Sequence, residues 1–204
     1  MKVYENLEQG TEEWLQVRLG KFTASKFAVI GSEGSGKGRG GLETLCVEKA
    51  AEIITGKPMA QFTNEDIERG HALEDEARGA YALETNNVVK QVGFVEFDEF
   101  TGCSPDGLVG RDGFTEYKCK DDKNHLLMIL GKEIDRAYQW QIQGGFYCMP
   151  KRKWCDFVSY NPNFTKKPLV IIRVYPDPEM QKAIKIGLEK AVNRLKEIIQ
   201  IANA

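Results

Sequence analysis

The spacing of hydrophobic positions divides the chain into a helical N-terminal part, a strand-rich middle part and a C-terminal helix. Apolar residues recur every three or four positions from Ile184 to Ile199, which predicts a helix over 178–201. Asp177 as N-cap, with Pro178 at the first helical position, gives this helix a favourable start. In the N-terminal part the same spacing, with Thr11 as a helix start, predicts helices over 11–19, 23–30, 42–54 and 64–84.

Short runs rich in β-branched and aromatic residues predict strands in the middle of the chain. These runs cover residues 88–97, 102–109, 114–118, 154–160 and 169–175. A helix over 135–149 is predicted to interrupt them. The combination favours the α/β (α+β) class, with a central mixed β-sheet flanked by helices. We expect a single domain over residues 1–204, because a chain of this length can bury one good core.

The composition argues against several classes of protein. Hydrophobic residues make up 42% of the chain, but no apolar run is long enough to span a membrane, and the acidic N-terminus lacks the features of a signal peptide. The five cysteines form no CxxC pair, which favours reduced thiols and a cytoplasmic location. With only His71 and His125 available, a zinc site or a Ser-His-Asp triad is not expected.

The net charge of −2 hides an uneven distribution. Acidic residues predominate between residues 60 and 100, whereas basic residues predominate between 150 and 170, including Lys151, Arg152 and Lys153. An acidic region can concentrate a divalent metal ion, and a basic region can contact phosphates, so the distribution is compatible with a metal-dependent nuclease. Solvated faces without a partner fit the same composition, and 151–153 could equally cap a strand.

A glycine-rich patch, GSEGSGKGRGG, covers residues 31–41. Its first seven positions match a Walker A loop, but Gly38 stands where Ser or Thr must bind magnesium, and the preceding segment is predicted to be a helix rather than a strand. We therefore expect no ATP binding here. The patch is interpreted as a surface loop from which Lys37 and Arg39 could contact DNA.

The stretch TGCSPDGLVGRDGFTEYKCK, residues 101–120, carries the strongest candidate chemistry. Asp106 lies in a Pro-Asp-Gly corner, and Glu116 and Lys118 lie on one face of the following predicted strand. Two carboxylates can hold one hard cation such as Mg²⁺, and the lysine can reach a water molecule beside it. The alternative is a β-hairpin whose turn aspartates and charged edge have no catalytic role.

At this point the sequence resembles a family, the phage lambda exonuclease group of the PD-(D/E)XK nuclease superfamily. The resemblance extends over about residues 8–160, and its motifs are EQGTEEWLQVRLGKFTAS, RGHALEDEAR, TGCSPDGL, TEYKC and AYQWQIQ. Each motif alone is a weak match, but all of them occur in the order of the family. The resemblance implies a restriction-endonuclease-like core with a helical N-terminal region and a C-terminal helix.

Carried over position by position, the resemblance implies a metal site and its catalytic residues. Asp106, Glu116, the backbone carbonyl of Tyr117 and Glu74 would contact the metal, and Lys118 would orient the attacking water. Gln141 would assist, although Gln139 and Gln143 lie close enough in sequence to take its place. Two Mg²⁺ ions are implied, with Mn²⁺ as an alternative, and Glu96, Asp98 or neither would bind the second. Considered without the family, Glu74 is simply an i,i+4 partner of Arg78.

The N-terminal motif implies a different task. Arg18, Thr23 and Ser25 match the family's pocket for a terminal 5′-phosphate, for which a guanidinium and hydroxyl groups are suitable ligands. Without the family, Arg18 is an arginine at a helix end and Ser25 a capping residue. Trp14, in the same motif, is expected to be a core anchor.

The resemblance therefore implies a 5′-to-3′ exonuclease that degrades one strand of linear double-stranded DNA to mononucleotides and leaves a 3′ tail for recombination. It also implies a homotrimeric ring around duplex DNA and a single-strand annealing protein as partner. An endonuclease on the same core, or a DNA-binding module without activity, remain as alternatives.

Overall fold

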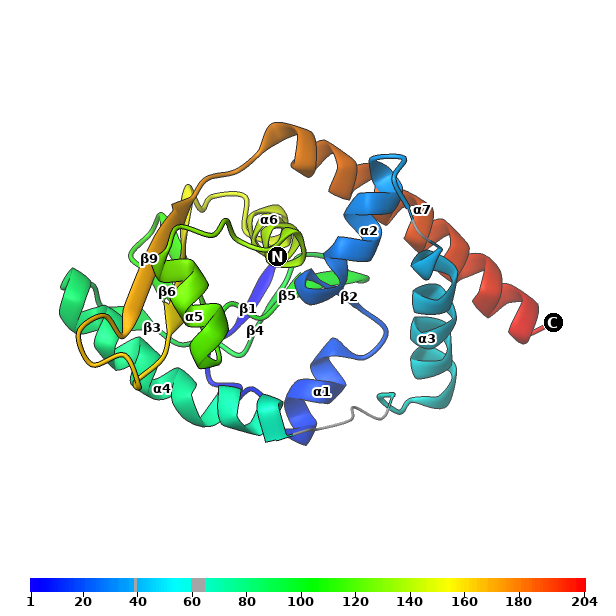
Figure 1. Ribbon diagram of the computed structural model, residues 1–204. Coiled ribbons are helices and arrows are strands. Elements are labelled where there is room, and N and C mark those ends of the chain that lie inside the picture. Colours follow the sequence, from blue (N-terminus) through cyan, green and yellow to red (C-terminus); the bar gives the residue numbers. More distant parts are fainter. Residues whose placement is uncertain (39, 60–64) are drawn as a thin grey trace.

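The computed structural model describes residues 1–38, 40–59 and 65–204, and of residues 65–72 the backbone only. Figure 1 shows the strands at the centre and left, with α2, α3 and α7 gathered on the other side. The mixed α/β class is confirmed, because helices flank mixed sheets. No disulfide links the cysteines of the described chain. None of its described helices has the length and apolar character to cross a membrane.

The larger sheet contains the strands that carry the candidate chemistry. Its central pair, β7 and β8, is parallel, whereas all its other pairs are antiparallel. Thr115 on β7 pairs with Gly107 on β6, so these two strands form the hairpin expected from residues 112–113. In spatial order the strands are β3 (Val89–Lys90), β6 (Gly107–Val109), β7 (Gly113–Cys119), β8 (Trp154–Tyr160) and β9 (Leu169–Val174).

A second, smaller sheet corrects the prediction of one central sheet. In spatial order it contains β1 (Lys2–Tyr4), β4 (Phe94–Glu96), β5 (Thr101–Cys103) and β2 (Phe22–Thr23). The predicted strand over 88–97 is divided between β3 and β4, and the one over 102–109 between β5 and β6. Gly93 marks the first division: its amide donates to the carbonyl of Tyr4, and a side chain there would meet the backbone of Leu7.

Two of the strands in this smaller sheet and one helix were not predicted. β1 and β2 are too short to show a two-residue alternation, and they are held by distant partners, Lys2 by Glu96 and Phe22 by Thr101. The helix α5 (Asp122–Ile129) is capped by Asp121, whose carboxylate accepts from the amide of Asn124. These elements depend on tertiary pairing or capping rather than on a repeating pattern.

Most of the predicted helices are confirmed with small changes at their ends. Thr11 caps α1 through the amide of Trp14, and Asp177 caps α7 through the amides of Glu179 and Met180. The helix predicted over 23–30 is wrong at its start, because Thr23 belongs to β2 and a 3₁₀ turn, η1 (Ala24–Lys26), precedes the helix proper. The predicted start of another helix at residue 64 lies outside the described residues. The α-helices besides α5 are α1 (Glu12–Arg18), α2 (Phe27–Gly34), α3 (Gly41–Thr55), α4 (Glu65–Thr85), α6 (Arg136–Cys148) and α7 (Pro178–Ala202).

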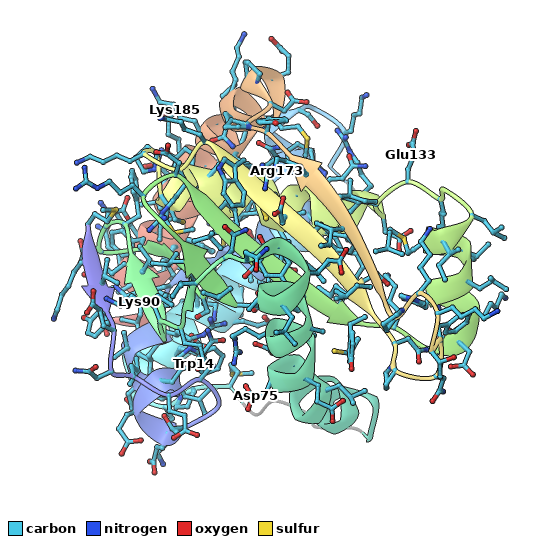
Figure 2. All side chains as sticks on the ribbon, turned by 90° about the vertical axis from the view of Figure 1, so that its left-hand side faces the viewer. Trp14, Asp75, Lys90, Glu133, Arg173 and Lys185 are labelled. Atoms are coloured by element: carbon cyan, nitrogen blue, oxygen red, sulfur yellow. The ribbon has the colours of Figure 1, made fainter. Side chains whose placement is uncertain are left out.

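The larger sheet lies between α4 on one face and α6 on the other. Figure 2, in which Arg173 marks β9, shows α4 crossing in front of the strands. Tyr117 of β7 packs against Tyr81 of α4, with ring centroids 6.1 Å apart, and Phe114 packs against Phe146 of α6 at 5.0 Å. Alternate residues of β7 therefore face different helices, and Glu116, on the same side as Phe114, faces α6.

Close packing of α2 on α7 changes the interpretation of the glycine-rich patch. Gly31–Gly34 belong to α2, and Gly41 begins α3, so the connecting loop is shorter than predicted. A side chain at Gly34 would overlap the backbone of Ala183, and one at Gly187 would overlap the backbone of Ile30. These glycines are needed because the two helix backbones lie in contact.

Replacing Gly34 by Ala is therefore expected to destabilise the protein by about 1–3 kcal/mol, as overpacking against rigid backbone does. The matched control is Gly79→Ala in the exposed part of α4, where a side chain meets nothing within 4 Å. There alanine should stabilise the helix by about 0.5–1 kcal/mol, because it favours helical backbone. Urea denaturation measures both values. Equal effects of the two substitutions would contradict the close contact of α2 and α7.

Candidate active site

The β6–β7 hairpin brings Asp106 beside Glu116. Asp106 immediately precedes β6, and its Oδ2 accepts a hydrogen bond of 2.6 Å from the amide of Tyr117. Glu116, in the middle of β7, is only 3% exposed. The pairing of Gly107 with Thr115 fixes this arrangement, because it sets the residues before and after them side by side. The two carboxylates predicted as metal ligands thus share one site.

Glu116 is the point at which the other two predicted catalytic residues meet. Its Oε1 accepts from Nζ of Lys118 at 2.6 Å and from Nε2 of Gln141 at 2.5 Å. Gln141 lies on α6, so the contact joins the helix to β7 across the sheet. Gln139 donates instead to the carbonyl of Ile134, and Gln143 to that of Tyr175. Of the three glutamines, Gln141 is therefore the one at the carboxylates.

Glu74 occupies the opposite side of the site, on α4. Its Oε1 lies 3.3 Å from Nη2 of Arg78, so the intrahelical ion pair expected without the family is present. Glu74 and Asp106 also line one cavity of about 570 Å³, whose wall includes residues 5–10. Within the described residues, however, no three acidic, His or Cys side chains are arranged as a ligand set.

The electrostatics of the site are those of crowded carboxylates. Burial raises the pKa of Asp106 to about 7, with Glu74 acting in the same direction and Lys118 opposing it. Burial also raises the pKa of Glu116 to about 7, and Asp106 adds to the effect. Burial disfavours the charge on Lys118, but Glu116 and Asp106 outweigh it and raise its pKa. A divalent cation would relieve the repulsion between the carboxylates.

A second cluster, which we call the Arg18 pocket, contains Arg18, Thr23, Ser25 and Ser104. Nη1 of Arg18 donates to Oγ of Ser104 at 2.8 Å, and Nη2 lies 3.5 Å from Oγ1 of Thr23, which in turn lies 3.3 Å from Oγ of Ser25. Three residues predicted to bind a phosphate are thus brought together. Burial lowers the pKa of Arg18 to about 10, so its charge is costly there without an anion.

Trp14 does not act as a core anchor. It is half-buried, its Nε1 donates to Gly93 and Ser104, and the guanidinium of Arg18 lies 3.8 Å from its ring. The indole therefore fixes the orientation of Arg18 by stacking.

Two residues of the site were missed by the sequence analysis. Ser104 stands two positions before Asp106 in TGCSPDGL, and that proximity was the available signal. Gln9 had no comparable signal, since its partners are distant in sequence. Its Nε2 donates to the carbonyl of Val92 at 3.0 Å and to that of Pro105 at 3.2 Å, so it holds the corner that carries Asp106.

Several weaker candidates lie apart from the carboxylates. Glu96 accepts from the hydroxyl of Tyr4, and Asp98 from the amide of Phe100. Arg152 donates to the carbonyls of Gly110 and Gly113, and Lys153 pairs with Asp112, so both fasten the end of the β6–β7 hairpin. These contacts favour the strand-capping interpretation of 151–153.

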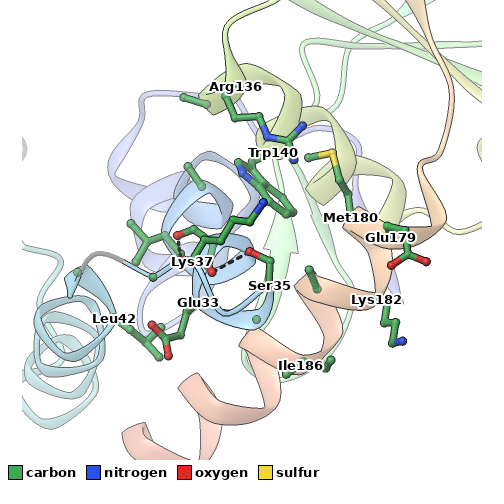
Figure 3. Close-up of a pocket in the computed structure, with 18 of the residues that line it drawn as sticks. Glu33, Ser35, Lys37, Leu42, Arg136, Trp140, Glu179, Met180, Lys182 and Ile186 are labelled. Carbon is green, nitrogen blue, oxygen red and sulfur yellow. Dashed lines mark hydrogen bonds between the residues drawn. The ribbon is translucent and has the colours of Figure 1, made fainter.

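Lys37 lines a separate cavity of about 1010 Å³ between α2, α6 and α7, near Arg136 and Trp140 (Figure 3). Lys37 remains a candidate for DNA contact. Arg39, its predicted companion, lies outside the described residues.

Comparison with known proteins agrees with this fold. Residues 13–149 match the model of the YqaJ-like viral recombinase domain. The crystal structure of LHK-Exo in complex with dAMP is 30% identical, covering 94% of this chain and 96% of that one, with a TM-score of 0.83. A structure of the alkaline exonuclease LHK-Exo from Laribacter hongkongensis is also 30% identical, covering 95% and 98% with a TM-score of 0.78.

A phage-related exonuclease from Haemophilus somnus 129PT shares the fold at 18% identity, covering 89% of this chain and 96% of that one, with a TM-score of 0.68. No curated protein matches the sequence.

The fold is that of a nuclease of the PD-(D/E)XK type. The chain belongs to the YqaJ-like viral recombinase domain family, which confirms the resemblance to the lambda exonuclease group. Membership of this family identifies the chain as a nuclease of the recombination exonuclease type.

Asp106→Asn is expected to stabilise the metal-free protein at about pH 8 by on the order of 1–2 kcal/mol. The pKa of Asp106 in the folded protein, about 7, lies above its usual value. Ionisation of Asp106 therefore opposes folding, and the free energy of unfolding decreases as pH rises towards about 7. The amide keeps an oxygen for the Tyr117 hydrogen bond. Thermal unfolding of the wild type should show stabilisation by Mg²⁺ at about pH 8 that fades below about pH 7 and is absent in the variant. Asp112→Asn, at a half-exposed aspartate that pairs with Lys153, should keep the Mg²⁺ stabilisation of the wild type, and retained Mg²⁺ stabilisation in Asp106→Asn would contradict the assignment.

Proposed function

We propose that the chain is a metal-dependent 5′-to-3′ exonuclease. It would degrade one strand of linear double-stranded DNA from a 5′-phosphorylated end to mononucleotides and leave a 3′ tail for recombination. The proposal rests on one arrangement of side chains. Asp106, Glu116, Lys118 and Gln141 converge, and only a short stretch of backbone separates them from the Arg18 pocket. The dAMP bound to the related LHK-Exo supports a mononucleotide product.

The donor set fits a hard divalent cation. Asp106 and Glu116 would hold it together with the carbonyl of Tyr117, and these ligands are all oxygen atoms, as Mg²⁺ or Mn²⁺ prefers. Among the described residues, Oδ1 of Asp106 and Oε2 of Glu116 carry no hydrogen bond and remain available. When bound, the metal would polarise the scissile phosphate and lower the pKa of a water molecule. A second ion near Glu74 forms part of the proposal.

The protein's own residues divide the remaining work. Lys118 would orient the attacking water and stabilise negative charge on the phosphate, since its ammonium group can contact both Glu116 and solvent. Gln141 holds Glu116 in place from α6, and Gln9 holds the corner of Asp106. Preorganisation of this kind reduces the rearrangement needed during the reaction.

The Arg18 pocket would receive the terminal 5′-phosphate. The guanidinium can donate two hydrogen bonds to one dianion, and the hydroxyls of Thr23, Ser25 and Ser104 add further donors. In the absence of phosphate, Arg18 uses Ser104 and Thr23 as partners, which a phosphate oxygen could replace.

Assembly and partners follow from the family resemblance. We propose a homotrimeric ring that encloses duplex DNA, and a single-strand annealing protein that receives the 3′ tail. A cytoplasmic location and independence of ATP complete the proposal.

Lys118→Ala is expected to reduce cleavage of a 5′-phosphorylated linear duplex by about 100-fold or more, the scale of a lost proton-transfer or positioning group. Binding to the same DNA should change little, because most of the affinity comes from other phosphate contacts. Cleavage with and without Mg²⁺ is followed by product length and polarity, and binding by fluorescence anisotropy. Lys185→Ala, at an exposed lysine of α7, provides the control.

The alternatives give different results in the same assay. Cutting of closed circular DNA would indicate an endonuclease, because no terminus is then needed. A wild type that binds DNA but shows no Mg²⁺-dependent cleavage would be a binding module.

Arg18→Ala should abolish the preference for a phosphorylated over a hydroxyl 5′ end. Each charge-assisted contact to the phosphate contributes about 1.5–3 kcal/mol, so the ratio of the two rates should fall by about tenfold or more. The ratio is internal to each enzyme, and a general loss of stability does not change it. Arg194→Ala, at an exposed arginine that pairs with Glu43, should leave the ratio intact. An unchanged ratio in Arg18→Ala would rule out the Arg18 pocket as the phosphate site.

A further inference from the structure

A second lysine lies beside the catalytic cluster. Lys120 follows Lys118 by two residues at the end of β7, and its side chain is only 10% exposed. Its Nζ lies 4.7 Å from the ring centroid of Tyr138, and Nζ of Lys118 lies 5.3 Å from the same centroid. Tyr138 stands one turn before Gln141 on α6, so one aromatic ring adjoins both ammonium groups and the glutamine that contacts Glu116.

The charge of Lys120 is weakly compensated. Asp135 lies 3.8 Å from Nζ of Lys120, is 46% exposed and lies closer to Lys132, at 3.0 Å. Lys118, in contrast, contacts Glu116 at 2.6 Å. Burial lowers the pKa of Lys120, Asp135 and Asp121 oppose this effect, and Lys132 and Lys118 add to it. Lys120 is thus a nearly buried cation whose ion pair with Asp135 is long and shared with Lys132.

A covered cation that is only partly compensated favours a further anion as partner, because burying charge is costly. The proposed substrate supplies regularly spaced anions, since each nucleotide of the cleaved strand carries one phosphate. Lys118 is already directed to the scissile phosphate and its water. The neighbouring cation can therefore meet the next phosphate along the strand, while the Tyr138 ring stabilises both ammonium groups through its π face.

We propose that Lys120 binds the backbone phosphate next to the scissile one on the cleaved strand and so positions that strand at the carboxylates. The proposal rests on the proposed nuclease function and deepens it. Lys120 is a substrate-positioning residue, and a lysine suits this task as a compact charge that contacts one phosphate at a time. The competing explanation is that Lys120 merely anchors Asp135 at the start of α6.

The test uses duplexes in which one linkage of the cleaved strand is an uncharged methylphosphonate, placed in turn at the second, third or fourth position from the 5′ end. Single-turnover rates of the first cleavage are measured with the wild type and Lys120→Met, which keeps the length of the side chain but removes its charge. For the wild type, a neutral linkage at one of the positions beyond the scissile linkage should slow cleavage about tenfold, the scale of one lost charge-assisted contact.

Lys120→Met should cleave all-phosphate DNA about tenfold more slowly than the wild type, and the neutral linkage at that position should slow it less than about twofold further. Neutral linkages at other positions should slow both enzymes equally. Lys120→Arg should restore the wild-type pattern. Lys132→Met, which removes the other lysine near Asp135, should show the full penalty of the wild type. If Lys120→Met does not fold by circular dichroism, Lys120→Gln replaces it.

Two results would overturn the proposal. In the first, Lys120→Met keeps the full tenfold penalty at the position where the neutral linkage slows the wild type. In the second, Lys120→Met cleaves all-phosphate DNA at the wild-type rate. The first of these results, with reduced thermal stability, would assign Lys120 a structural role. If the wild type cleaves none of the duplexes with Mg²⁺, the nuclease function fails and this inference fails with it. Active wild type without the specific loss of penalty in Lys120→Met refutes the inference alone.

Discussion

The repulsion between Asp106 and Glu116 is the constraint to which the surrounding residues respond. Two buried carboxylates tend to separate or to take up protons, and the β6–β7 hairpin prevents separation by fixing Gly107 opposite Thr115. A side chain at Gly107 would collide with Val89 and Thr115, so the close approach of the strands requires a glycine. Lys118, Gln141 and the Tyr117 amide then share the negative charge. This crowding lowers local stability, and under the proposed function it keeps a cation site preorganised.

The two sheets serve this site in different ways. The larger sheet supplies Asp106 from just before β6 and Glu116 and Lys118 from β7, with α6 behind them. The smaller sheet supplies β5, after which Ser104 emerges next to the Arg18 pocket. Since the chain passes from Ser104 through Pro105 to Asp106, the Arg18 pocket and the carboxylates are joined by a single short segment. The N-terminal segment lines the same cavity as Asp106, and Gln9 donates to the carbonyls of Val92 and Pro105.

Sequence patterns predicted the elements that have an internal signal. The β8 strand and the α6 and α7 helices were placed closely, because their alternation, helical spacing or caps lie within the element itself. The division of 88–97 and 102–109 between two sheets was not predicted, since their partners, such as Lys2 and Phe22, are far away in sequence. Asp106, Glu116 and Lys118 follow from local order, but their grouping with Arg18 required the family resemblance. Gln9 and Ser104 became visible only through their contacts in the folded chain.

The segment from Ser104 to Asp106 has a consequence for the step of the enzyme. Ser104 belongs to the cluster proposed to hold the DNA end, and Asp106 to the pair proposed to mark the cut, with Pro105 alone between them. Proline fixes one backbone torsion, and Gln9 clamps its carbonyl, so the segment cannot stretch easily. Under the proposed function, the fixed length of this segment sets the distance between the bound DNA end and the cleaved bond, and therefore the size of the product. The size of the product released at each cleavage would then depend on three residues rather than on the whole assembly.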